Sequence, residues 1–477
     1  MEYTLGDEGT RLGVVSARSF STLKLQAALL SNLESLGYRA MTPIQAQSLP
    51  HILAGKDVIA QSKTGSGKTA AFGLGLLQKL DVGNYQPQSL VLCPTRELAD
   101  QVARELRRLA RKIHNIKILT LCGGVPIGPQ ITSLERGAHI VVGTPGRIED
   151  HLRKNTLKLN SVNTLVLDEA DRMLDMGFEP SVDAITARIP RPRQTWLFSA
   201  TYPDQINSMA NRIMVEPVMV KVESTHDRAT IREHFHTFKE NKHRMTALRL
   251  LLLKARPESA LVFCNTRVEA QEVADELRGR GFAALALHGD LEQRERDRTL
   301  VRFANKSTSI LVATDVAARG LDIDAVDAVI NYHIARDPEV HIHRIGRTGR
   351  AGSKGIAYTL YSEKEAYKVA RLEAYLERTI EAEPLPPYTL LEKPGYKPGM
   401  VCLQIDGGRK QKVRPGDILG ALTGKNGIAG RQVGKIHIFD QFAYVAVSRD
   451  AARPALKKLI EGKLKGRSFR ARRISGQ

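Results

Sequence analysis

The chain has 477 residues, of which 42% are hydrophobic, and it carries a formal net charge of +20. This length exceeds what one hydrophobic core supports, so two or three domains are expected, and the composition excludes a disordered chain. No apolar run reaches the length of a membrane span, and acidic residues near the start argue against a signal peptide. The four cysteines form no C-x-x-C pair, which favours buried thiols in a reducing cytoplasm over disulfides or zinc.

Residues 1–18 show no clear periodicity and are expected to form a flexible extension. Short apolar runs then alternate with amphipathic helical patterns over residues 19–220, and the same pattern restarts over residues 221–380. Continuous apolar strands that alternate with helices predict a parallel sheet covered by helices on both faces. We therefore expect two doubly wound α/β domains. The predicted strands are 57–60, 90–93, 116–119, 139–142, 164–168, 195–199, 260–264, 283–287, 310–313, 328–330 and 356–360.

The C-terminal part of the chain has a different character. Residues 381–399 are rich in proline and glycine and predict a linker. Residues 400–477 predict the order β-α-β-β-α-β, which is that of a ferredoxin-like sandwich. From Lys397 to Gln477 there are 18 Lys plus Arg and 5 Asp plus Glu, a net charge of +13. Such a compact basic module indicates a nucleic-acid partner, and a generic solubility patch is the alternative.

A glycine-rich run follows the first predicted strand and precedes a helical pattern. Gly65 and Gly67 permit tight turns, and successive N–H groups at a helix start bind phosphate oxygens. Lys68 would reach the β and γ phosphates, and Thr69 would offer its hydroxyl to Mg²⁺. The usual pattern has glycine where this chain has Ser62, and a plain glycine-rich turn is the alternative. The predicted phosphate loop comprises Ser62, Lys63, Thr64, Gly65, Ser66, Gly67, Lys68 and Thr69.

Two acidic residues stand at the end of a later apolar strand. Asp168 would hold the Mg²⁺ through water, and Glu169 would orient and activate the attacking water. Acidic residues are also common at helix starts, which is the alternative interpretation. The combination with the phosphate loop favours a nucleotide-hydrolysing site.

An arginine-rich run at 343–350 lies in the second predicted domain. Arg347 and Arg350 are three residues apart, so both side chains could point the same way and stabilise charge on the γ phosphate. ATP would then be bound between the two domains, and catalysis would require their closure. A solvated basic loop, or contacts with nucleic-acid phosphates, would also explain these arginines. Metal binding by His341 and His343 is disfavoured because no third ligand lies near them in sequence.

These motifs resemble those of the DEAD-box RNA helicases. The sequence Asp-Glu-Ala-Asp occurs at 168–171, and the other motifs follow in the family's order between residues 20 and 375. They lie at 37–45, 94–98, 123–124, 144–147, 199–201, 293–296, 313–322 and 343–350. The resemblance implies two RecA-like domains, and an RNA-stimulated ATPase that uses ATP and Mg²⁺ and unwinds short duplexes locally. We expect the protein to act as a monomer.

The resemblance also implies roles for individual residues near the nucleotide. The amide of Gln45 would read adenine, and the ring of Phe20 would stack on the base. Gly320 and Asp322 would contact the nucleotide from the second domain.

Further residues would couple hydrolysis to closure or bind RNA. By resemblance, Ser199 and Thr201 would act with Asp171 in the coupling. The implied contacts with the RNA backbone are Arg96, Gly124, Thr144, Arg147, Arg267, Gly289 and Thr314. Backbone contacts carry no base-sequence information, so this core is expected to be unspecific.

RNA specificity is then expected from the basic C-terminal module. Phe442 and Tyr444 partly follow an RRM signature, and strand alternation places both on one sheet face where bases could stack. An aromatic pair that only covers the sheet is the alternative, and RNA could instead lie along 409–414 and 457–473. The segments 402–408, 414–424 and 463–467 resemble a bacterial subgroup of the family. That resemblance implies a hairpin of 23S rRNA and a large ribosomal subunit precursor as partners.

The sequence therefore predicts an ATP-dependent RNA helicase that remodels 23S rRNA in an immature large subunit. An ATP-gated RNA clamp with little unwinding is the non-enzymatic alternative, and a DNA translocase is another enzymatic one.

Overall fold

The computed structural model describes residues 19–62, 65–222, 231–318, 326–349 and 355–474. The chain forms two compact units, and among the described residues unit 1 ends at residue 222 and unit 2 begins at residue 231. None of the described helices is both long and apolar enough to cross a membrane.

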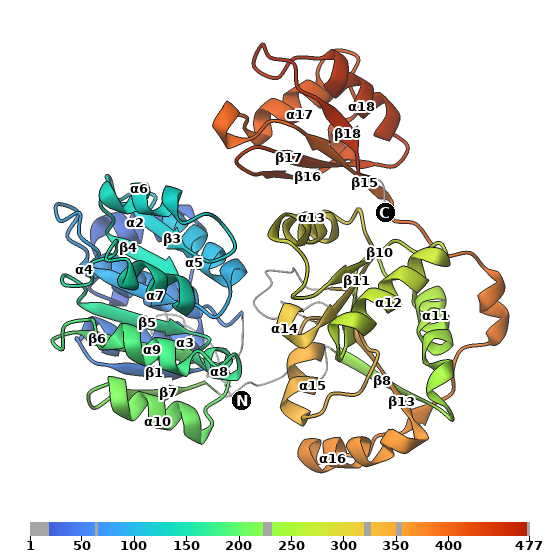
Figure 1. Ribbon diagram of the computed structural model, residues 1–477, viewed down its shortest axis with the longest axis horizontal. Coiled ribbons are helices and arrows are strands. Elements are labelled where there is room, and N and C mark those ends of the chain that lie inside the picture. Colours follow the sequence, from blue (N-terminus) through green and yellow to red (C-terminus); the bar gives the residue numbers. More distant parts are fainter. Residues whose placement is uncertain (1–18, 63–64, 223–230, 319–325, 350–354, 475–477) are drawn as a thin grey trace, which may run out of the picture. The chain divides into compact units, whose positions relative to one another are not determined.

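Unit 1 is built on a seven-stranded sheet in which all neighbouring strands run parallel (Figure 1). Its strand order is β3-β4-β2-β5-β6-β1-β7, which confirms a doubly wound sheet. The six strands predicted from apolar runs in this part of the chain are present, and the edge strand β7 is added to them. The strands are β1 (Val58–Gln61), β2 (Ser89–Leu92), β3 (Ile118–Leu121), β4 (Ile140–Gly143), β5 (Thr164–Asp168), β6 (Gln194–Ser199) and β7 (Val218–Lys221).

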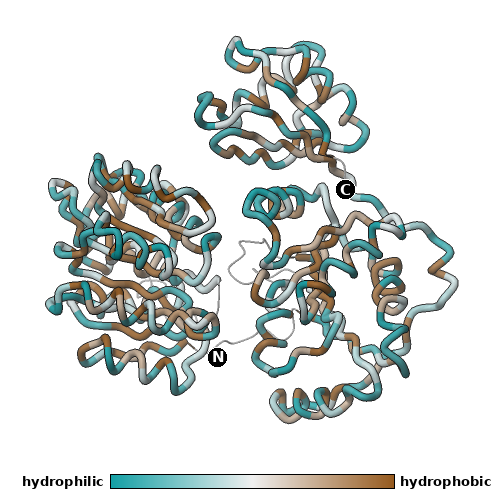
Figure 2. Tube along the Cα trace, viewed as in Figure 1, coloured by the Kyte–Doolittle hydropathy of each residue, from teal (hydrophilic) through white to brown (hydrophobic). Residues whose placement is uncertain are grey.

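Helices cover both faces of this sheet because successive strand residues point to opposite sides. Val91 packs into one apolar cluster, whereas Leu90 and Leu92 pack into the other. Figure 2 shows these strands mainly in the colours of hydrophobic residues. The first cluster is covered by α2 (Ala27–Ser35), α3 (Pro43–Leu53), α4 (Lys68–Lys79) and α5 (Arg96–Leu109). The second is covered by α7 (Pro145–Arg153), α8 (Ala170–Asp175), α9 (Glu179–Thr186) and α10 (Asp204–Ile213), and α6 spans Gly128–Glu135.

Unit 2 contains a second parallel sheet of seven strands, in the order β10-β11-β9-β12-β13-β8-β14. The sequence analysis did not anticipate β8 and β14. Strand β8 carries arginine, glutamate and two histidines, so it forms no apolar run. The strands are β8 (Ile231–Phe238), β9 (Ala260–Cys264), β10 (Ala284–Leu287), β11 (Ile310–Thr314), β12 (Ala328–Asn331), β13 (Gly355–Ser362) and β14 (Ala382–Glu383).

The segment predicted as a linker packs against this second domain. Strand β14 pairs with β8, and the buried ring of Tyr396 packs edge-on against Phe282 with ring centres 5.7 Å apart.

The helices of this domain are α11 (Arg244–Ala255), α12 (Arg267–Gly279), α13 (Gln293–Ala304), α14 (Asp315–Ala318), α15 (Pro338–Ile345) and α16 (Ala366–Leu376). Single 3-10 turns are η1 (Phe20–Thr22), η3 (Asn241–His243), η4 (Glu363–Glu365), η5 (Tyr388–Glu392), η6 (Arg409–Gln411) and η7 (Gly430–Gln432).

The C-terminal domain confirms the predicted β-α-β-β-α-β order. Its antiparallel sheet has the order β16-β17-β15-β18, and α17 (Pro415–Thr423) and α18 (Ala452–Glu461) pack on one face. The other face carries Cys402 and Tyr444, which form a small apolar cluster with Val301 of α13. The strands are β15 (Met400–Ile405), β16 (Val433–Ile438), β17 (Ala443–Ser448) and β18 (Ala471–Arg473).

Candidate active site and nucleic-acid interface

The predicted phosphate loop lies between β1 and the first turn of α4. Gly67 has a left-handed backbone with φ of 95°, and a Cβ atom there would lie 2.5 Å from Nε2 of Gln45, so only glycine fits. The buried Lys68 donates from Nζ to the carbonyl of Ser62 at 2.7 Å, and the Ser62 hydroxyl lies 2.8 Å from that of Ser66. The ammonium group of Lys68 therefore lies beside Ser62, and Lys68 itself begins α4, whose first N–H groups suit a phosphate.

Gln45 connects the start of α3 to this loop. Its Oε1 accepts the N–H of Thr42 at 2.9 Å, and its Nε2 donates to the carbonyl of Gly67 at 3.0 Å. The hydroxyl of Thr42 is buried without a hydrogen-bond partner. Phe20 is buried in the apolar cluster and packs edge-on against Tyr38, with ring centres 6.1 Å apart. The adenine contacts of Gln45 and Phe20 stay predictions.

Asp168 and Glu169 lie at the carboxyl end of β5, where α8 begins. Burial, together with repulsion from Glu169, raises the pKa of Asp168 to about 7, although Lys68 acts against this. Glu169 has a left-handed backbone with φ of 55°, a conformation that costs a non-glycine residue about 1–3 kcal/mol. Two buried carboxylates in sequence, one of them strained, form a site that a nearby cation would stabilise.

The residues around this acidic pair fit a magnesium-bound polyphosphate. Mg²⁺ prefers oxygen ligands and is usually held by one or two carboxylates together with substrate phosphates and water. Asp168 supplies a buried carboxylate, and Thr69, the second residue of α4, supplies a hydroxyl. The buried ammonium group of Lys68 and the glycine-rich turn supply positive charge and N–H groups for phosphate oxygens.

Asp171 joins the acidic segment to the turn after β6. Its Oδ2 accepts hydrogen bonds from the N–H and hydroxyl of Thr201, both at 3.0 Å, and from the N–H of Ala200 at 3.2 Å. The N–H of Asp171 donates to the Ser199 hydroxyl at 3.4 Å, and the Ser199 carbonyl accepts the N–H of Ser62 at 3.0 Å. Burial acts to raise the pKa of Asp171, but the bonds from Thr201 and the nearby Lys68 hold it below its usual value. Hydrogen bonds thus connect the phosphate loop to the predicted coupling residues.

Arg172 is a site residue that the sequence analysis did not identify. Its guanidinium forms a buried ion pair with Glu169, three residues earlier. The signal was present in the sequence, since residues three apart on a helix are neighbours. The sequence does not reveal the left-handed backbone of Glu169, however, so it could not distinguish this buried pair from an exposed one.

The RNA contacts predicted in unit 1 lie at the carboxyl ends of β2, β3 and β4. Arg96 begins α5, Thr144 precedes α7, and a Cβ atom on Gly124 would lie 2.1 Å from Nη1 of Arg96. Arg147 donates from Nη2 to the carbonyl of Val125 at 3.0 Å. The Nε and Nη1 atoms of both arginines are buried without hydrogen-bond partners, so this edge offers donors that suit an anionic backbone.

The predicted RNA contacts of unit 2 also share one sheet edge. Arg267 begins α12 and forms an ion pair with Asp290, next to Gly289 at the end of β10. Thr314 ends β11, and its hydroxyl accepts the N–H of Ala317 at 3.4 Å. Because β10, β11 and β9 are neighbours, the three predicted contacts Arg267, Gly289 and Thr314 follow adjacent strands.

The remaining residues predicted to contact the nucleotide are only partly described. Arg347 is buried just after α15, and its carbonyl accepts the N–H of Val326 at 3.1 Å. Lys63, Thr64, Gly320, Asp322 and Arg350 lie outside the described residues, so their roles stay predictions.

The aromatic pair of the C-terminal domain packs against α13. Tyr444 is only 4% exposed and contacts the cluster that contains Val301, and the guanidinium carbon of Arg294 lies 4.6 Å from the ring centre of Phe442. Asn305 donates from Nδ2 to Sγ of Cys402 at 3.3 Å. This arrangement favours the alternative interpretation, in which the pair covers the sheet. The basic residues that remain exposed on this domain include Arg409, Lys410, Lys412, Arg414, Lys463, Lys465, Arg467, Arg470, Arg472 and Arg473.

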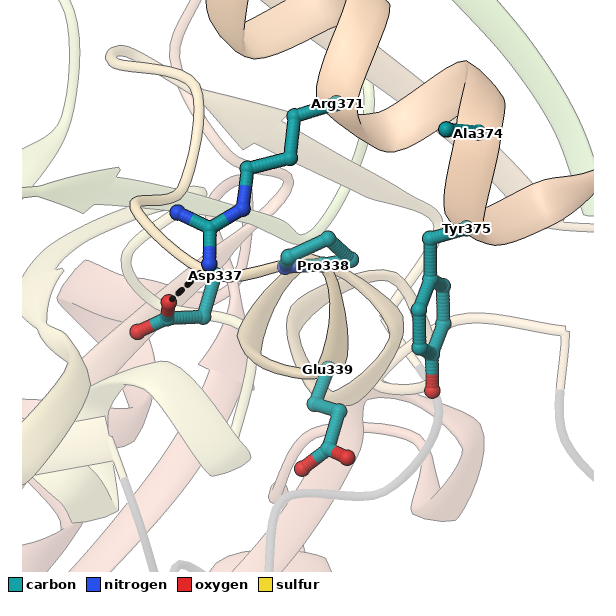
Figure 3. Close-up of a pocket in the computed structure, with 6 residues that line it drawn as sticks. All are labelled: Asp337, Pro338, Glu339, Arg371, Ala374 and Tyr375. Atoms are coloured by element: carbon teal, nitrogen blue, oxygen red, sulfur yellow. Dashed lines mark ion pairs between the residues drawn. The ribbon is translucent and has the colours of Figure 1, made fainter.

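A surface hollow of about 540 Å³ in unit 2 shares none of the predicted site residues. Figure 3 shows Arg371 reaching Asp337, an ion pair of 3.6 Å, with Glu339 and Tyr375 beside them. Two carboxylates against one guanidinium do not suit a polyphosphate. The hollow is lined by Asp337, Pro338, Glu339, Arg371, Ala374 and Tyr375.

Three family models match successive parts of the chain. Residues 42–209 match the DEAD/DEAH box helicase model, and residues 242–352 match the helicase conserved C-terminal domain. Residues 402–473 match the DbpA RNA binding domain.

Individual proteins show the same similarity. The chain is 52% identical over 455 residues to the ATP-dependent RNA helicase DbpA of Escherichia coli K12, covering 95% of this chain and 99% of that protein. It is 46% identical over 363 residues to the DEAD-box ATP-dependent RNA helicase CshA of Bacillus cereus, covering 76% of this chain and 69% of that protein. Among solved structures, S. cerevisiae Dbp5 bound to RNA and ADP BeF3 is similar with a TM-score of 0.70 and 31% identity, covering 77% of this chain and 96% of that one.

Proposed function

Because the chain belongs to the DEAD-box family of ATP-dependent RNA helicases, we propose that it remodels 23S rRNA during assembly of the large ribosomal subunit. The observation that carries this proposal is the C-terminal domain. It matches a DbpA RNA binding domain over residues 402–473 and holds +13 of the chain's +20 net charge within residues 397–477. Nucleic-acid partners are favoured by such a concentration of positive charge.

In the proposed reaction, unit 1 binds ATP and positions the water. The turn before α4 and the ammonium group of Lys68 would bind the phosphates, and Thr69 and Asp168 would hold Mg²⁺. Bound Mg²⁺ would neutralise charge on the transferring phosphoryl group. Glu169 accepts a proton from the attacking water, with Arg172 fixing the direction of its carboxylate. Arg347 and Arg350 supply positive charge to the γ phosphate.

The proposed coupling to RNA uses the hydrogen bonds around Asp171. A change in the phosphate loop reaches Ser199 through the N–H of Ser62 and reaches Thr201 through Asp171. We propose that this connection transmits the state of the nucleotide to the RNA-binding edge. A strand held by Arg96, Arg147 and Arg267 would then be bent when ATP is bound, which would open a short duplex.

The proposed target is selected outside this core. Phosphate contacts do not read base sequence, so the basic segments 409–414 and 457–473 of the C-terminal domain are proposed to bind a structured rRNA hairpin. The packing of Tyr444 against α13 supports this choice over the sheet face.

We also propose that the protein acts as a monomer in the cytoplasm, where its four buried thiols would stay reduced.

RNA crosslinking in cells, followed by mapping of the bound sites, tests this proposal. The full chain is expected to crosslink mainly to one region of 23S rRNA, and a variant without residues 397–477 is expected to lose this enrichment. Enrichment on another class of RNA, or an unchanged map in the shortened variant, would contradict the proposed target.

A further inference from the structure

His333 lies between two carboxylates at the carboxyl edge of the second large sheet. It follows β12, and its Nε2 lies 2.5 Å from Oε1 of Glu269, while its Nδ1 lies 3.8 Å from Oε1 of Glu365. An ionised carboxylate only accepts hydrogen bonds, so Nε2 must carry a proton. A second proton, on Nδ1, is favoured by the negative charge of Glu365, which makes the imidazolium the form that fits this position.

Charged and titratable groups approach His333 from several elements. Burial acts to lower the pKa of His333, but the interactions with Glu269 and Glu365 outweigh it and raise the pKa above the ordinary value of 6.5. Opposing burial, His333 also holds the pKa of both carboxyls below the usual range. Glu269 of α12 and Glu365 of η4 face the imidazole, and the ring of Tyr332 packs edge-on against it. Arg244 of α11 and Lys368 of α16 pair with Glu365, and Arg344 of α15 binds the main-chain carbonyl of His333.

Glu269 also shapes the turn between β9 and α12. Its Oε2 accepts the N–H of Asn265 at 3.2 Å, and its own N–H donates to the hydroxyl of Thr266 at 3.2 Å. These reciprocal bonds fix the backbone from which Arg267 extends as the first residue of α12. The imidazole of His333 therefore holds the carboxylate that closes this turn.

The main chain of His333 is hydrogen-bonded to the arginine-rich segment at 343–350. Its carbonyl accepts Nη1 of Arg344 at 2.8 Å, and Arg344 binds both carboxylate oxygens of Asp315 at 2.6 Å and 2.7 Å. One residue thus contacts the turn that carries Arg267 and the helix that precedes Arg347.

We propose that His333 is a positioning residue that holds Glu269 against the turn at 265–267 and thereby presents Arg267 to the RNA backbone. This inference rests on the proposed contact between Arg267 and RNA. Because a raised pKa means that the folded state favours the protonated form, the charge-assisted interaction with both carboxylates is complete at acidic pH. As pH rises through that raised value, Nδ1 loses its proton, and only a weaker, neutral hydrogen bond from Nε2 to Glu269 remains. RNA binding through this edge is therefore expected to weaken on going from slightly acidic to alkaline conditions.

The test uses the full chain, a non-hydrolysable ATP analogue and a single-stranded oligouridylate, from about pH 6 to about pH 8.5. The wild-type affinity is expected to fall about fivefold over this range, and His333→Gln is expected to bind at the weaker level throughout. His234→Gln is the matched control, because His234 pairs with Glu383 at 2.7 Å, away from the turn, and it should keep the wild-type profile. A His333→Gln profile that runs parallel to the wild type would overturn the inference.

Arg267→Gln separates this inference from the proposed function. If Arg267→Gln leaves RNA affinity unchanged, the RNA contact itself is wrong. If it weakens binding while His333→Gln keeps the wild-type profile, only the positioning role is wrong. A nuclear magnetic resonance titration of the wild-type histidines needs no variant. A measured pKa of His333 at or below the ordinary 6.5 would also overturn the inference.

Discussion

The carboxylate of Asp171 accepts hydrogen bonds from both the backbone N–H and the hydroxyl of Thr201, each at 3.0 Å. Asp171 lies in the first turn of α8, which follows β5, and Thr201 lies between the neighbouring strand β6 and α10. Through Ser199, the same turn contacts the phosphate loop at Ser62. A nucleotide-dependent change at the loop therefore has a direct hydrogen-bonded route to the segment that follows β6.

Replacing Thr201 by valine should separate ATP hydrolysis from unwinding. The substitution removes one of the three hydrogen bonds to Oδ2 of Asp171 and nearly preserves the shape of the side chain. A hydrogen bond to a charged group contributes about 1.5–3 kcal/mol, so unwinding is expected to fall about tenfold while ATPase activity stays within about twofold. Thr201→Ser, which keeps the hydroxyl, should restore unwinding. Parallel loss of both activities in Thr201→Val would contradict a coupling role.

Glu169→Gln should keep ATP binding and lose turnover. The amide has the size of the carboxylate but cannot take a proton from water at neutral pH, and general-base catalysis contributes about 10²–10⁴-fold. We expect at least about a hundredfold loss of steady-state ATPase with fluorescent ATP binding within about twofold. Glu179→Gln, an exposed substitution in the same unit, is the control. Normal turnover in Glu169→Gln would refute its catalytic role.

Arg172→Met tests the ion pair that holds Glu169. The loss of the guanidinium should let the carboxylate turn away, so kcat is expected to fall about tenfold while KM for ATP changes little. Arg172→Lys should recover part of the activity because it keeps the charge but not the planar fork. Arg188→Met, at an exposed arginine of the same unit, should have wild-type kinetics. If KM rises while kcat is unchanged, Arg172 serves ATP binding instead.

The C-terminal domain allows a test of where RNA lies. Phe442 packs beneath Arg294, so Phe442→Ala should leave hairpin affinity within about twofold of the wild type. The double variant Arg409→Gln and Arg414→Gln should lower affinity about tenfold and reduce the salt dependence by about two counterions. The opposite ranking, measured by binding titrations over a range of salt, would place the RNA on the sheet face.

The sequence predicted the core of both large sheets because their strands are buried on both faces. An apolar run such as Leu90–Leu92 is visible without any tertiary information, since alternate residues enter different clusters. Strand β8 escaped prediction because its arginine, glutamate and histidines give no such run, and β14 contains only two residues. Strand β8 forms because it pairs with β13, and β14 forms because it pairs with β8, so both strands depend on tertiary contacts.

The candidate nucleotide site could be proposed from the sequence for a different reason: its residues lie in short, local motifs. Lys68 and Asp168 are recognised by their neighbours in sequence, and the hydrogen bonds of Asp171 then follow from adjacent strands. Tyr444 was ambiguous because an aromatic residue on a half-covered sheet looks the same whether a base or a helix covers it. His333 belongs to no motif, and its carboxylate partners come from α12 and η4, 64 and 32 residues away in the sequence.

We propose that the C-terminal domain directs the helicase core to 23S rRNA. The ATPase rate of the full chain with equal masses of 23S and 16S rRNA, compared with that of the variant that lacks residues 397–477, tests this role. We predict stronger stimulation of the full chain by 23S rRNA, and weak, equal stimulation of the shortened variant by both RNAs. Equal stimulation of the full chain by the two RNAs would contradict the claim.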